Sequence, residues 1–500
     1  MRGRSTRAAC IVAAAAAALF IALSAPAALS AADTSQAVRR LQRDITAALS
    51  APHLQAGTWG VAVRSLSKRE TVFDLNATKL LVPSSNMKIV TLAAAAERLG
   101  WDFTYETRLE AAGPIASGVL NGDLVVVGSG DPSIDDWDGI ATRLFQEWSD
   151  QLKAAGVRTI AGRIVGDDNT FADEGVGSGW AWDDLDRSFA TSVGALQFNE
   201  NTAQITVTPA PQAGAAATIT WAPPSAMLVV RGTVATGPRG TFVTLATQRL
   251  PGSQALDVRG SVPLGSAPIV RNVSVLNPTA YFVNHLRAAL IANGIEVRGA
   301  AVDIDDAAAP PLRQSLTPLV SHRSPPLSEL ATTMMRLSQN LYAETLLKTL
   351  GNWVGLPTTQ GGIAAVKNVM ENWNIPADGL HQIDGSGLSH YNLVTPDTFV
   401  RILSHVDAEP RLRDTFRATL PVAGRAGTLE NRMRGTPAQG NARAKTGSLT
   451  NARSLSGYVT SADGEPLAFS IIANNYGISA ETIDKAEDDI VVRLARFTRK

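Results

Sequence analysis

Two changes in residue pattern constrain the fold of this chain more than any other feature. Residues 81–100, LVPSSNMKIVTLAAAAERLG, end in an alanine-rich run with high helix propensity. Between about residues 106 and 304 the chain instead shows short alternating runs, such as GDLVVVGSGDPS and TAQITVTPA, separated by Gly, Pro and Asn. Helical periodicity returns after residue 326. The pattern predicts a protein of mixed α and β structure, and 500 residues predict roughly two to four domains.

Several segments have a clear local pattern. Residues 57–83 predict a β-hairpin, because apolar and β-branched runs flank the polar turn SLSKRE. Residues 137–156 are the one clear helix of the β-rich region. Residues 304–326 are rich in Pro and Ala and predict a linker. After residue 450 we expect two strands and a final helix packed on the adjacent sheet, with a membrane-surface helix as the alternative.

The N-terminus has the pattern of a signal peptide. Three arginines in MRGRSTR precede the apolar run AACIVAAAAAALFIALS, and the small residues of APAALSAAD follow it. We therefore expect residues 1–32 to be removed near Ala32, with an uncleaved membrane anchor as the alternative. The only cysteine, Cys10, lies in this segment, so neither disulfides nor thiol chemistry are expected in the mature chain. No later stretch reaches the roughly 18 apolar residues of a spanning helix, which predicts an exported protein, periplasmic or extracytoplasmic, soluble or peripherally associated with a membrane.

Charge and residue spacing argue against several classes of function. Lys plus Arg and Asp plus Glu both total 45, so no basic excess indicates a nucleic-acid partner. The six histidines lack metal-ligand spacing, and we predict no metal and no organic cofactor. Asp123 and Asp131 flank a glycine-rich turn and are interpreted as turn caps rather than as a calcium site. The tryptophans, at positions 59, 101, 137, 148, 180, 182, 221, 353 and 373, are interpreted as core residues.

Ser85 and Lys88 form an S-x-x-K motif at the predicted start of a helix. Residues three apart share a helix face, and a helix N-terminus offers free N–H groups and a partial positive charge. A lysine whose pKa is lowered by burial can accept the proton of a serine hydroxyl. Ser85 is therefore a candidate nucleophile, with a helix N-cap as the alternative. A second copy, from Ser65 to Lys68, falls in the predicted hairpin turn and is not expected to react.

Two further short motifs follow in the chain. Ser338 and Asn340 form an S-x-N motif within the predicted helical run, where the serine can relay a proton and the amide can hold a substrate carbonyl. Lys445 and Thr446 begin a K-T-G motif at the start of a β-pattern, where a cation and a hydroxyl suit a carboxylate and the glycine permits close approach. The order S-x-x-K, S-x-N, K-T-G is a signature of penicillin-binding proteins and class A β-lactamases.

A serine triad is a competing interpretation. Ser386, His390 and Asp384 lie close together in IDGSGLSH, but triad members so near in sequence rarely converge in space. No G-x-S-x-G elbow occurs anywhere in the chain. We interpret the glycines of this stretch as shaping a loop beside the active site.

With these motifs the chain resembles the class C low-molecular-mass penicillin-binding proteins, the D-alanyl-D-alanine carboxypeptidase/endopeptidase family (peptidase family S13). The resemblance covers nearly the whole mature chain, including GDDNTFADEGVGSGWAWDD, SVGALQFNEN, SQNLYAETLLKTLG, IDGSGLSHYNLVTP, LPVAGRAGTLENRMRGTPA and ARAKTGSLTNARSLSGYV. It implies a multidomain α+β fold. A penicillin-binding/serine β-lactamase-like transpeptidase domain, with a central antiparallel sheet flanked by helices, would carry two inserted β-rich domains.

The resemblance also implies domain limits. The catalytic domain would comprise residues 33–105 and 305–500. Inserted domain II would comprise residues 106–185 and 272–304, and inserted domain III residues 186–271. The last strands and helix of the chain would rejoin the first hairpin in one sheet.

The same resemblance implies roles for the motif residues. Ser85 would be the acylated nucleophile and Lys88 its general base. Ser338 would pass the proton towards the leaving amine, and Asn340 would orient the substrate and the lysine.

The third motif would bind one end of the substrate. Lys445 and Thr446 would hold the terminal carboxylate of the peptide, and the N–H groups of Ser85 and Ser448 would form the oxyanion hole. The chain departs from the family at Gln339, where the family usually has aspartate. The two flanking side chains are intact, and activity is expected to survive with altered local electrostatics.

The implied function is that of a serine-type D-alanyl-D-alanine carboxypeptidase/endopeptidase. It would act on peptidoglycan stem peptides through an acyl-enzyme on Ser85 and be inhibited covalently by β-lactam antibiotics such as penicillin. One alternative is a β-lactamase or esterase of the same fold, against which the long insertion argues. The other is a cell-wall binding protein with a decayed active site, against which the intact motifs argue.

Overall fold

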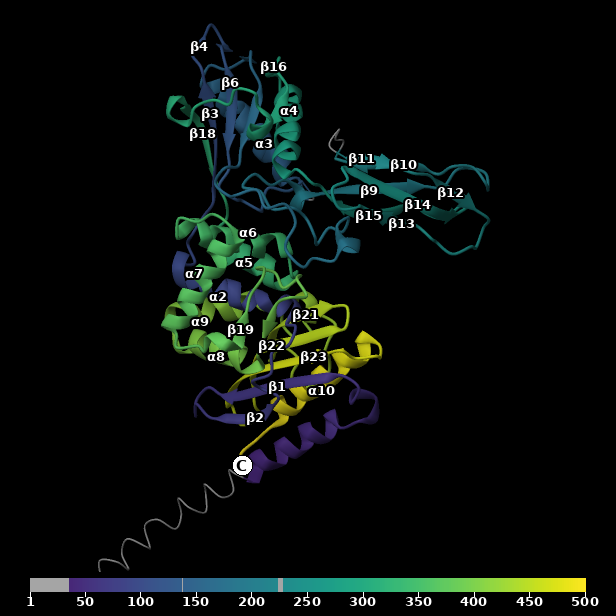
Figure 1. Cartoon of the computed structure of the whole chain (residues 1–500), viewed down its shortest axis with the longest axis vertical. Coiled ribbons are helices and arrows are strands. Elements are labelled where there is room, and N and C mark those ends of the chain that lie inside the picture. The colour runs from purple at the N-terminus through teal and green to yellow at the C-terminus, as the bar shows by residue number, and fades with distance from the viewer. Residues whose placement is uncertain (1–35, 137, 224–227) are drawn as a thin grey trace, which may run out of the picture.

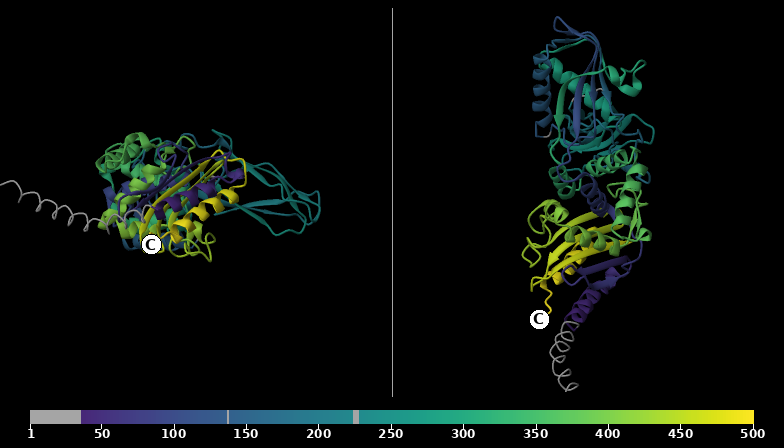
Figure 2. Two further views of the ribbon diagram at one scale, coloured as in Figure 1. Left: turned by 90° about the horizontal axis from the view of Figure 1, so that it is seen from below. Right: turned by 90° about the vertical axis from the view of Figure 1, so that its left-hand side faces the viewer.

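The computed structural model describes residues 36–136, 138–223 and 228–500. The predicted signal peptide, residues 1–32, lies outside these residues. The chain forms a lower lobe, an upper lobe and a flat arm of strands that extends sideways (Figure 1). Figure 2 shows that the two lobes are stacked along the long axis of the molecule. The first hairpin and the C-terminal strands both lie in the lower lobe.

A five-stranded antiparallel sheet forms the centre of the lower lobe. Its order is β2-β1-β23-β22-β21, so the ends of the chain meet in one sheet as predicted. The strands are β1 Thr58–Ser65, β2 Thr71–Leu75, β21 Arg443–Leu449, β22 Ala452–Thr460 and β23 Pro466–Asn474. The predicted hairpin is therefore β1 and β2, and the strand carrying the K-T-G motif is at the sheet edge.

Helices cover both faces of this sheet, because its residues alternate between two hydrophobic cores. Ala62, Ala468 and Ile472 pack with the helices α2 Met87–Leu99 and α8 Pro396–Ala408. The sheet residues next to them in sequence point to the opposite face. These residues, Val61, Val63, Phe469 and Ile471, pack against residues 36–49 and against α10 Ala480–Arg496. The final helix therefore packs on the sheet, as expected.

The remaining helices of the lower lobe surround α2. They are α5 Leu327–Arg336, α6 Asn340–Trp353, α7 Thr359–Asn372 and α9 Pro410–Thr419. The prediction that Ser338 lies within a helical run is wrong. The run breaks between α5 and α6, where Ser338 adopts a left-handed backbone with φ of 61° that a continuing helix cannot contain.

The upper lobe contains two sheets. One has the order β17-β8-β6-β3-β18, and the other has the order β16-β7-β5-β4. The bounds of their strands are β3 Glu106–Ala112, β4 Ile115–Ala116, β5 Val119–Leu120, β6 Asp123–Val127, β7 Thr159–Ile160, β8 Ile164–Asp167, β16 Glu296–Val297, β17 Ala301–Asp303 and β18 Thr317–Arg323.

Two sequence predictions are wrong in the upper lobe. The expected helix is present as α3 Ile140–Ala154, but a second helix, α4 Pro278–Ala292, packs beside it. A proline at its first position and Asn277 as its N-cap give that helix a start signal. The predicted linker contains strand β18, which pairs with β3 and returns the chain to the lower lobe. The proline-rich flanks of this strand conceal its pattern.

The arm consists of two small sheets. Their orders are β10-β9-β15 and β11-β14-β12, with β13 also paired to β14. The strands are β9 Thr202–Thr208, β10 Thr218–Ala222, β11 Val229–Arg231, β12 Val234–Gly237, β13 Ala246–Gln248, β14 Ala255–Pro263 and β15 Ile269–Ser274. One hydrophobic cluster joins the arm to the upper lobe. The grouping of sheets supports a division into a catalytic unit and two insertions, which stays a proposal.

The tryptophan prediction is correct in part for the residues that the structure describes, and Trp137 lies outside them. Trp59 and Trp148 are buried in the core. Trp182 and Trp353 are instead 55% and 54% exposed, and Trp353 lies under the Arg98 guanidinium. Among the residues described, no helix combines the length and apolar character needed to cross a bilayer.

Candidate active site

Ser85 lies where the chain enters the central helix of the lower lobe. A short 3₁₀ turn, η2 Ser84–Asn86, leads directly into α2. Ser84 is buried and has a positive φ of 49°, which is uncommon for a serine and turns the chain sharply. Lys88 follows one turn later, and its Nζ is 3.0 Å from Oγ of Ser85. The expected S-x-x-K geometry is present here.

The second S-x-x-K copy has no such geometry. Ser65 ends β1, and its Oγ accepts a hydrogen bond from the main-chain N–H of Lys68. This contact closes the hairpin turn, in which Lys68 is exposed. The copy therefore lacks the buried lysine beside a serine hydroxyl that the first copy has.

Lys88 is fully buried and makes three polar contacts through Nζ. Besides Ser85, they are Oδ1 of Asn340 at 2.6 Å and the main-chain oxygen of Ser386 at 2.9 Å. Burial lowers the pKa of Lys88 from 10.5 to about 7, against the opposing effect of the carboxylates of Glu344 and Asp384. Near neutral pH, a substantial share of this amine is therefore unprotonated.

The second motif lies at the break between α5 and α6. Asn340 is the first residue of α6, and its Nδ2 donates to the main-chain oxygen of Phe189 at 2.8 Å. Gln339 is the N-cap of α6 and accepts from the N–H of Leu341 at 3.4 Å. The unusual Gln339 therefore takes a helix-capping role, and it also hydrogen-bonds Glu200. The motif residues on either side of it, Ser338 and Asn340, both line the cavity described below.

The third motif lies on edge strand β21. Lys445 is fully buried, and its Nζ donates to Oγ of Ser338 at 2.8 Å and to the main-chain oxygen of Thr446 at 2.7 Å. The Thr446 hydroxyl donates to Thr428. Burial, followed by the charge of Lys88, lowers the pKa of Lys445 well below its usual value.

Glycine at position 447 allows β21 to lie directly against η2. A Cβ at this position would be 2.2 Å from Oγ of Ser454 and 2.8 Å from the main-chain oxygen of Pro83. The Asn86 amide strengthens the same junction when its nitrogen donates to the main-chain oxygen of Lys445 at 2.7 Å. The first and third motifs therefore meet through close backbone contact.

A cavity of about 360 Å³ opens where the three motifs meet. The motif residues that line it are Ser85, Ser338, Asn340, Thr446 and Ser448. Lys88 and Lys445 lie behind its wall. All seven predicted site residues are thus brought together, although 253 positions separate the first two motifs (338 minus 85).

Several lining residues were not found from the sequence. Asp184 and Phe189 come from the segment between β8 and β9, and Thr428 precedes β21. Asp184 and Thr428 belong to stretches that carry the family resemblance, and Phe189 lies between two such stretches, but no short motif marks any of the three. Gly387 and Leu388 also line the cavity, which confirms that the IDGSGLS stretch forms a loop beside the site.

This loop does not form the alternative serine triad. The Asp384 carboxylate accepts from the main-chain N–H groups of Gly387 and Ser389 and from the Trp180 indole. Oγ of Ser386 accepts from the N–H of Leu388. These side chains stabilise the loop rather than form a nucleophile with its base.

The two aspartates that flank the glycine-rich turn, Asp123 and Asp131, make local structural contacts. Asp123 pairs with Arg163, and Asp131 accepts from the main-chain N–H and hydroxyl of Ser133. These contacts match the predicted caps.

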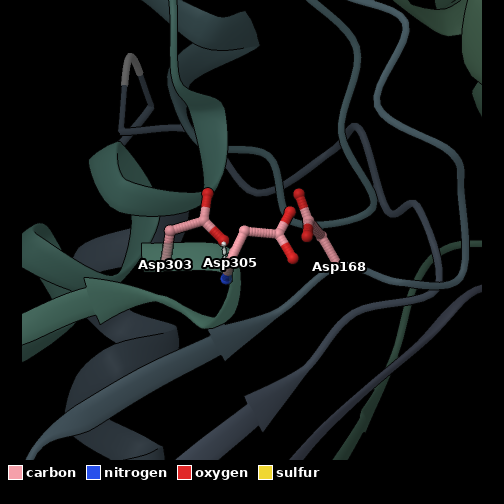
Figure 3. A group of neighbouring side chains, drawn as sticks. All are labelled: Asp168, Asp303 and Asp305. Atoms are coloured by element: carbon pink, nitrogen blue, oxygen red, sulfur yellow. Dashed lines mark hydrogen bonds between the residues drawn. The ribbon is translucent and has the colours of Figure 1, made fainter. Parts of the chain in front are cut away.

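Three carboxylates, of Asp168, Asp303 and Asp305, lie within 4.8 Å of one another (Figure 3). Asp168 accepts from the Thr279 hydroxyl, and burial raises its pKa to about 7. Both oxygens of Asp303 accept hydrogen bonds, from Asn277 and from the N–H of Asp305. These hydrogen bonds give the cluster a local structural role.

Comparison with known proteins identifies the class to which this fold and site belong. The sequence model of the D-Ala-D-Ala carboxypeptidase 3 (S13) family matches residues 41–497, and the chain belongs to this family of serine-type hydrolases. It is 34% identical over 482 residues to a D-alanyl-D-alanine carboxypeptidase of Actinomadura, which covers 93% of this chain and 86% of that protein. The chain is thus a member of the D-Ala-D-Ala carboxypeptidases.

Solved structures of a related protein have the same fold. The crystal structure of penicillin-binding protein 4 (DacB) from Haemophilus influenzae superimposes with a TM-score of 0.78 at 26% identity, covering 91% of this chain and 99% of that one. A complex of that protein with a β-lactam matches with a TM-score of 0.75 at 25% identity and the same coverage. The predicted α+β multidomain penicillin-binding fold is confirmed.

Proposed function

We propose that this protein is a carboxypeptidase/endopeptidase that cleaves peptidoglycan stem peptides through an acyl-enzyme on Ser85 and is inhibited by penicillin. The observation that carries the proposal is the buried Lys88 amine 3.0 Å from the Ser85 hydroxyl. A serine hydroxyl is a weak nucleophile until a base takes its proton. An amine with a pKa of about 7 is suited to do so near neutral pH.

In the proposed acylation, Ser85, Lys88 and Ser338 act in turn. Oγ of Ser85 attacks the carbonyl carbon between two D-alanines, and its proton passes to Nζ of Lys88. A C–O bond forms and the C–N bond breaks, while the proton held by Lys88 is relayed through the Ser338 hydroxyl to the departing amine. Water then attacks the ester, which releases the shortened peptide and restores the Ser85 hydroxyl.

The third motif and two main-chain N–H groups would bind the substrate and stabilise the negative charge of the intermediate. Thr446 lines the cavity, and Lys445 lies behind it in contact with Ser338. Both residues would bind the substrate carboxylate. Strand β21 is at the sheet edge, so alternate N–H groups point away from the sheet. This supports the N–H groups of Ser448 and Ser85 as the oxyanion hole, where two donors stabilise the tetrahedral intermediate.

The similarity to a penicillin-binding protein with a bound β-lactam supports acylation of this chain by the same class of compound. A β-lactam carries a carboxylate and a strained amide, which match Lys445 and Ser85. The proposed location is periplasmic or extracytoplasmic, soluble or peripherally associated with a membrane, because the proposed substrate belongs to the cell wall.

Mass spectrometry of the penicillin-treated protein tests the proposal. We expect one adduct of the mass of intact penicillin on the tryptic peptide that carries Ser85, and no adduct in Ser85→Ala. Ser65→Ala is the matched control and should be labelled as the wild type is. A covalent adduct that persists in Ser85→Ala would contradict the assignment.

Turnover assays separate the proposal from a β-lactamase. We expect release of free D-alanine from a peptide ending in D-Ala-D-Ala, and slow hydrolysis of the penicillin ester. Cleavage of a cross-linked muropeptide would show the endopeptidase activity. Rapid turnover of penicillin without release of D-alanine would favour the β-lactamase alternative.

A further inference from the structure

The three contacts of the Lys88 amine determine where its lone pair points. A neutral primary amine has two N–H donors and one acceptor site. The main-chain oxygen of Ser386 and Oδ1 of Asn340 can only accept hydrogen bonds, so they take the two N–H groups. The lone pair is then left facing the Ser85 hydroxyl, which is the remaining contact. The Ser386 carbonyl therefore helps to make Lys88 a base directed at Ser85.

The main chain immediately before the Ser386 carbonyl is held in place by a buried carboxylate. Oε2 of Glu344 accepts from the N–H of Gly385 at 2.9 Å, and Oε1 accepts from the N–H of Ser386 at 2.7 Å. Both oxygens accept main-chain N–H groups, as an ionised carboxylate does. The Gly385 carbonyl is fixed in turn by the Thr91 hydroxyl of α2 at 2.7 Å. The Gly385–Ser386 peptide group, which precedes the carbonyl that contacts Lys88, is thus fixed from two helices. The peptide group of that carbonyl is fixed in turn by the N–H of Gly387, which donates to Asp384 at 2.7 Å.

One helix supplies both partners of this arrangement. Glu344 lies one turn after Asn340 on α6, so the two side chains share a helix face. Asn340 contacts the amine directly, and Glu344 acts through the main-chain N–H groups of Gly385 and Ser386. A shift of α6 would therefore displace both acceptors together.

Glu344 also contributes charge. The charged groups that face Lys88 are Glu344, Asp384 and Lys445. Burial lowers the pKa of Lys88, whereas Glu344 is the larger of the two opposing effects. Burial, followed by the charge of Asp384, raises the pKa of Glu344 to about 7, and the hydrogen bonds from Ser386 and Gly385 oppose that rise. In its ionised form the carboxylate raises the pKa of the Lys88 amine against the effect of burial.

We propose that Glu344 is a positioning residue for the general base: by fixing the main chain of Gly385 and Ser386 it places the Ser386 carbonyl on Lys88, so that the lone pair of the amine points at Ser85. This inference rests on the proposed acylation of Ser85. Glu344 itself touches neither the substrate nor the reacting atoms.

The pH profile of acylation by a fluorescent penicillin tests the inference in three variants. Glu344→Gln keeps the size but replaces one acceptor with an NH₂ group and removes the charge. We expect acylation to slow about 10- to 100-fold, since a misplaced catalytic group costs on this order, and its acidic limb to move to lower pH. Glu344→Asp keeps the charge but is too short, so we expect a slower rate with an acidic limb close to that of the wild type.

Glu487→Gln is the matched control. Glu487 is equally buried on α10 and pairs with Arg432, on the opposite face of the sheet. The Glu487→Gln substitution should lower the melting temperature of the protein. The pH profile of its acylation rate, measured per folded molecule, should stay that of the wild type. If Glu344→Gln behaves in the same way, with only its stability reduced, the positioning role is wrong.

The two proposals fail in different ways. If the wild type is not acylated at Ser85, or if Lys88→Met is acylated at the wild-type rate, the proposed function fails. If the wild type is acylated and Glu344→Gln retains both its rate and its acidic limb, only the inference about Glu344 fails. Should Glu344→Gln not fold, an unchanged rate in Glu344→Asp would overturn the inference.

Discussion

Two buried lysine–serine pairs face the same cavity, and they differ in their charged surroundings. Lys88 lies 3.0 Å from Ser85, and Lys445 lies 2.8 Å from Ser338. Burial lowers the pKa of both amines. Carboxylates oppose this effect at Lys88, whereas the neighbouring charge at Lys445 is that of Lys88 and lowers its pKa further.

The difference indicates a division of labour between the pairs. Lys88 has protein carboxylates nearby and keeps a pKa of about 7, so it can take up and release a proton near neutrality. Burial and the charge of Lys88 both lower the pKa of Lys445, and no carboxylate opposes them among the causes of its shift. The carboxylate of a substrate would supply that partner and stabilise the charged ammonium. One pair is suited to catalysis and the other to binding an anion.

Replacing Lys88 should have the largest effect. Lys88→Met keeps an unbranched side chain of similar length but removes the base, and we expect acylation to slow by about 10²- to 10⁴-fold. Stopped-flow kinetics with a fluorescent penicillin measure this rate. Lys68→Met removes the lysine of the second S-x-x-K copy and should leave the rate unchanged. Equal losses in the two variants would contradict the assignment.

Replacing Lys445 should affect recognition rather than the base. In the wild type, kcat/KM should be higher for a peptide with a free terminal carboxylate than for its C-terminal amide. Lys445→Met should reduce kcat/KM for the acid about 10- to 100-fold, because a hydrogen bond to a charged group is lost. The preference for the acid should therefore largely disappear. A variant that keeps this preference would show that Lys445 does not bind the carboxylate, and Lys367→Met on the surface of α7 serves as the control.

The junction between the two pairs should tolerate little added volume. Gly447→Ala places a Cβ against Ser454 and Pro83, and we expect the free energy of unfolding to fall by about 1–3 kcal/mol. Gly477→Ala has no atom within 4 Å of its Cβ and is the control. Denaturant titration compares the two. Equal stability of both variants would mean that β21 does not need close contact with η2.

The sequence predicts the lower lobe well for a physical reason. The hairpin, the last two strands and α10 have regular apolar periods, and the three motifs have fixed chemical spacing. The seven predicted site residues do surround one cavity. Their roles remain predictions that the experiments above test.

Features that depend on tertiary contact could not be predicted in the same way. The break at Ser338 interrupts an apolar helical pattern, and only the left-handed backbone reveals it. Strand β18 is stabilised by its partner β3 rather than by its own proline-flanked sequence. Glu344 resembles an ordinary helix residue until the loop at Gly385 packs against it. A charged residue on the apolar face of a helix, one turn after Asn340, is the signal that could have identified it.

The protonation of Lys88 in the free protein tests the central claim most directly. NMR of lysine ε-groups labelled with ¹³C, with Lys88→Met to assign the signal, measures its pKa. Burial depresses the folded-state value, so the amine should become neutral as pH rises through about 7. The acidic limb of acylation should have the same midpoint. A midpoint near 10.5, or an acylation rate independent of pH between 6 and 8, would contradict Lys88 as the base that activates Ser85.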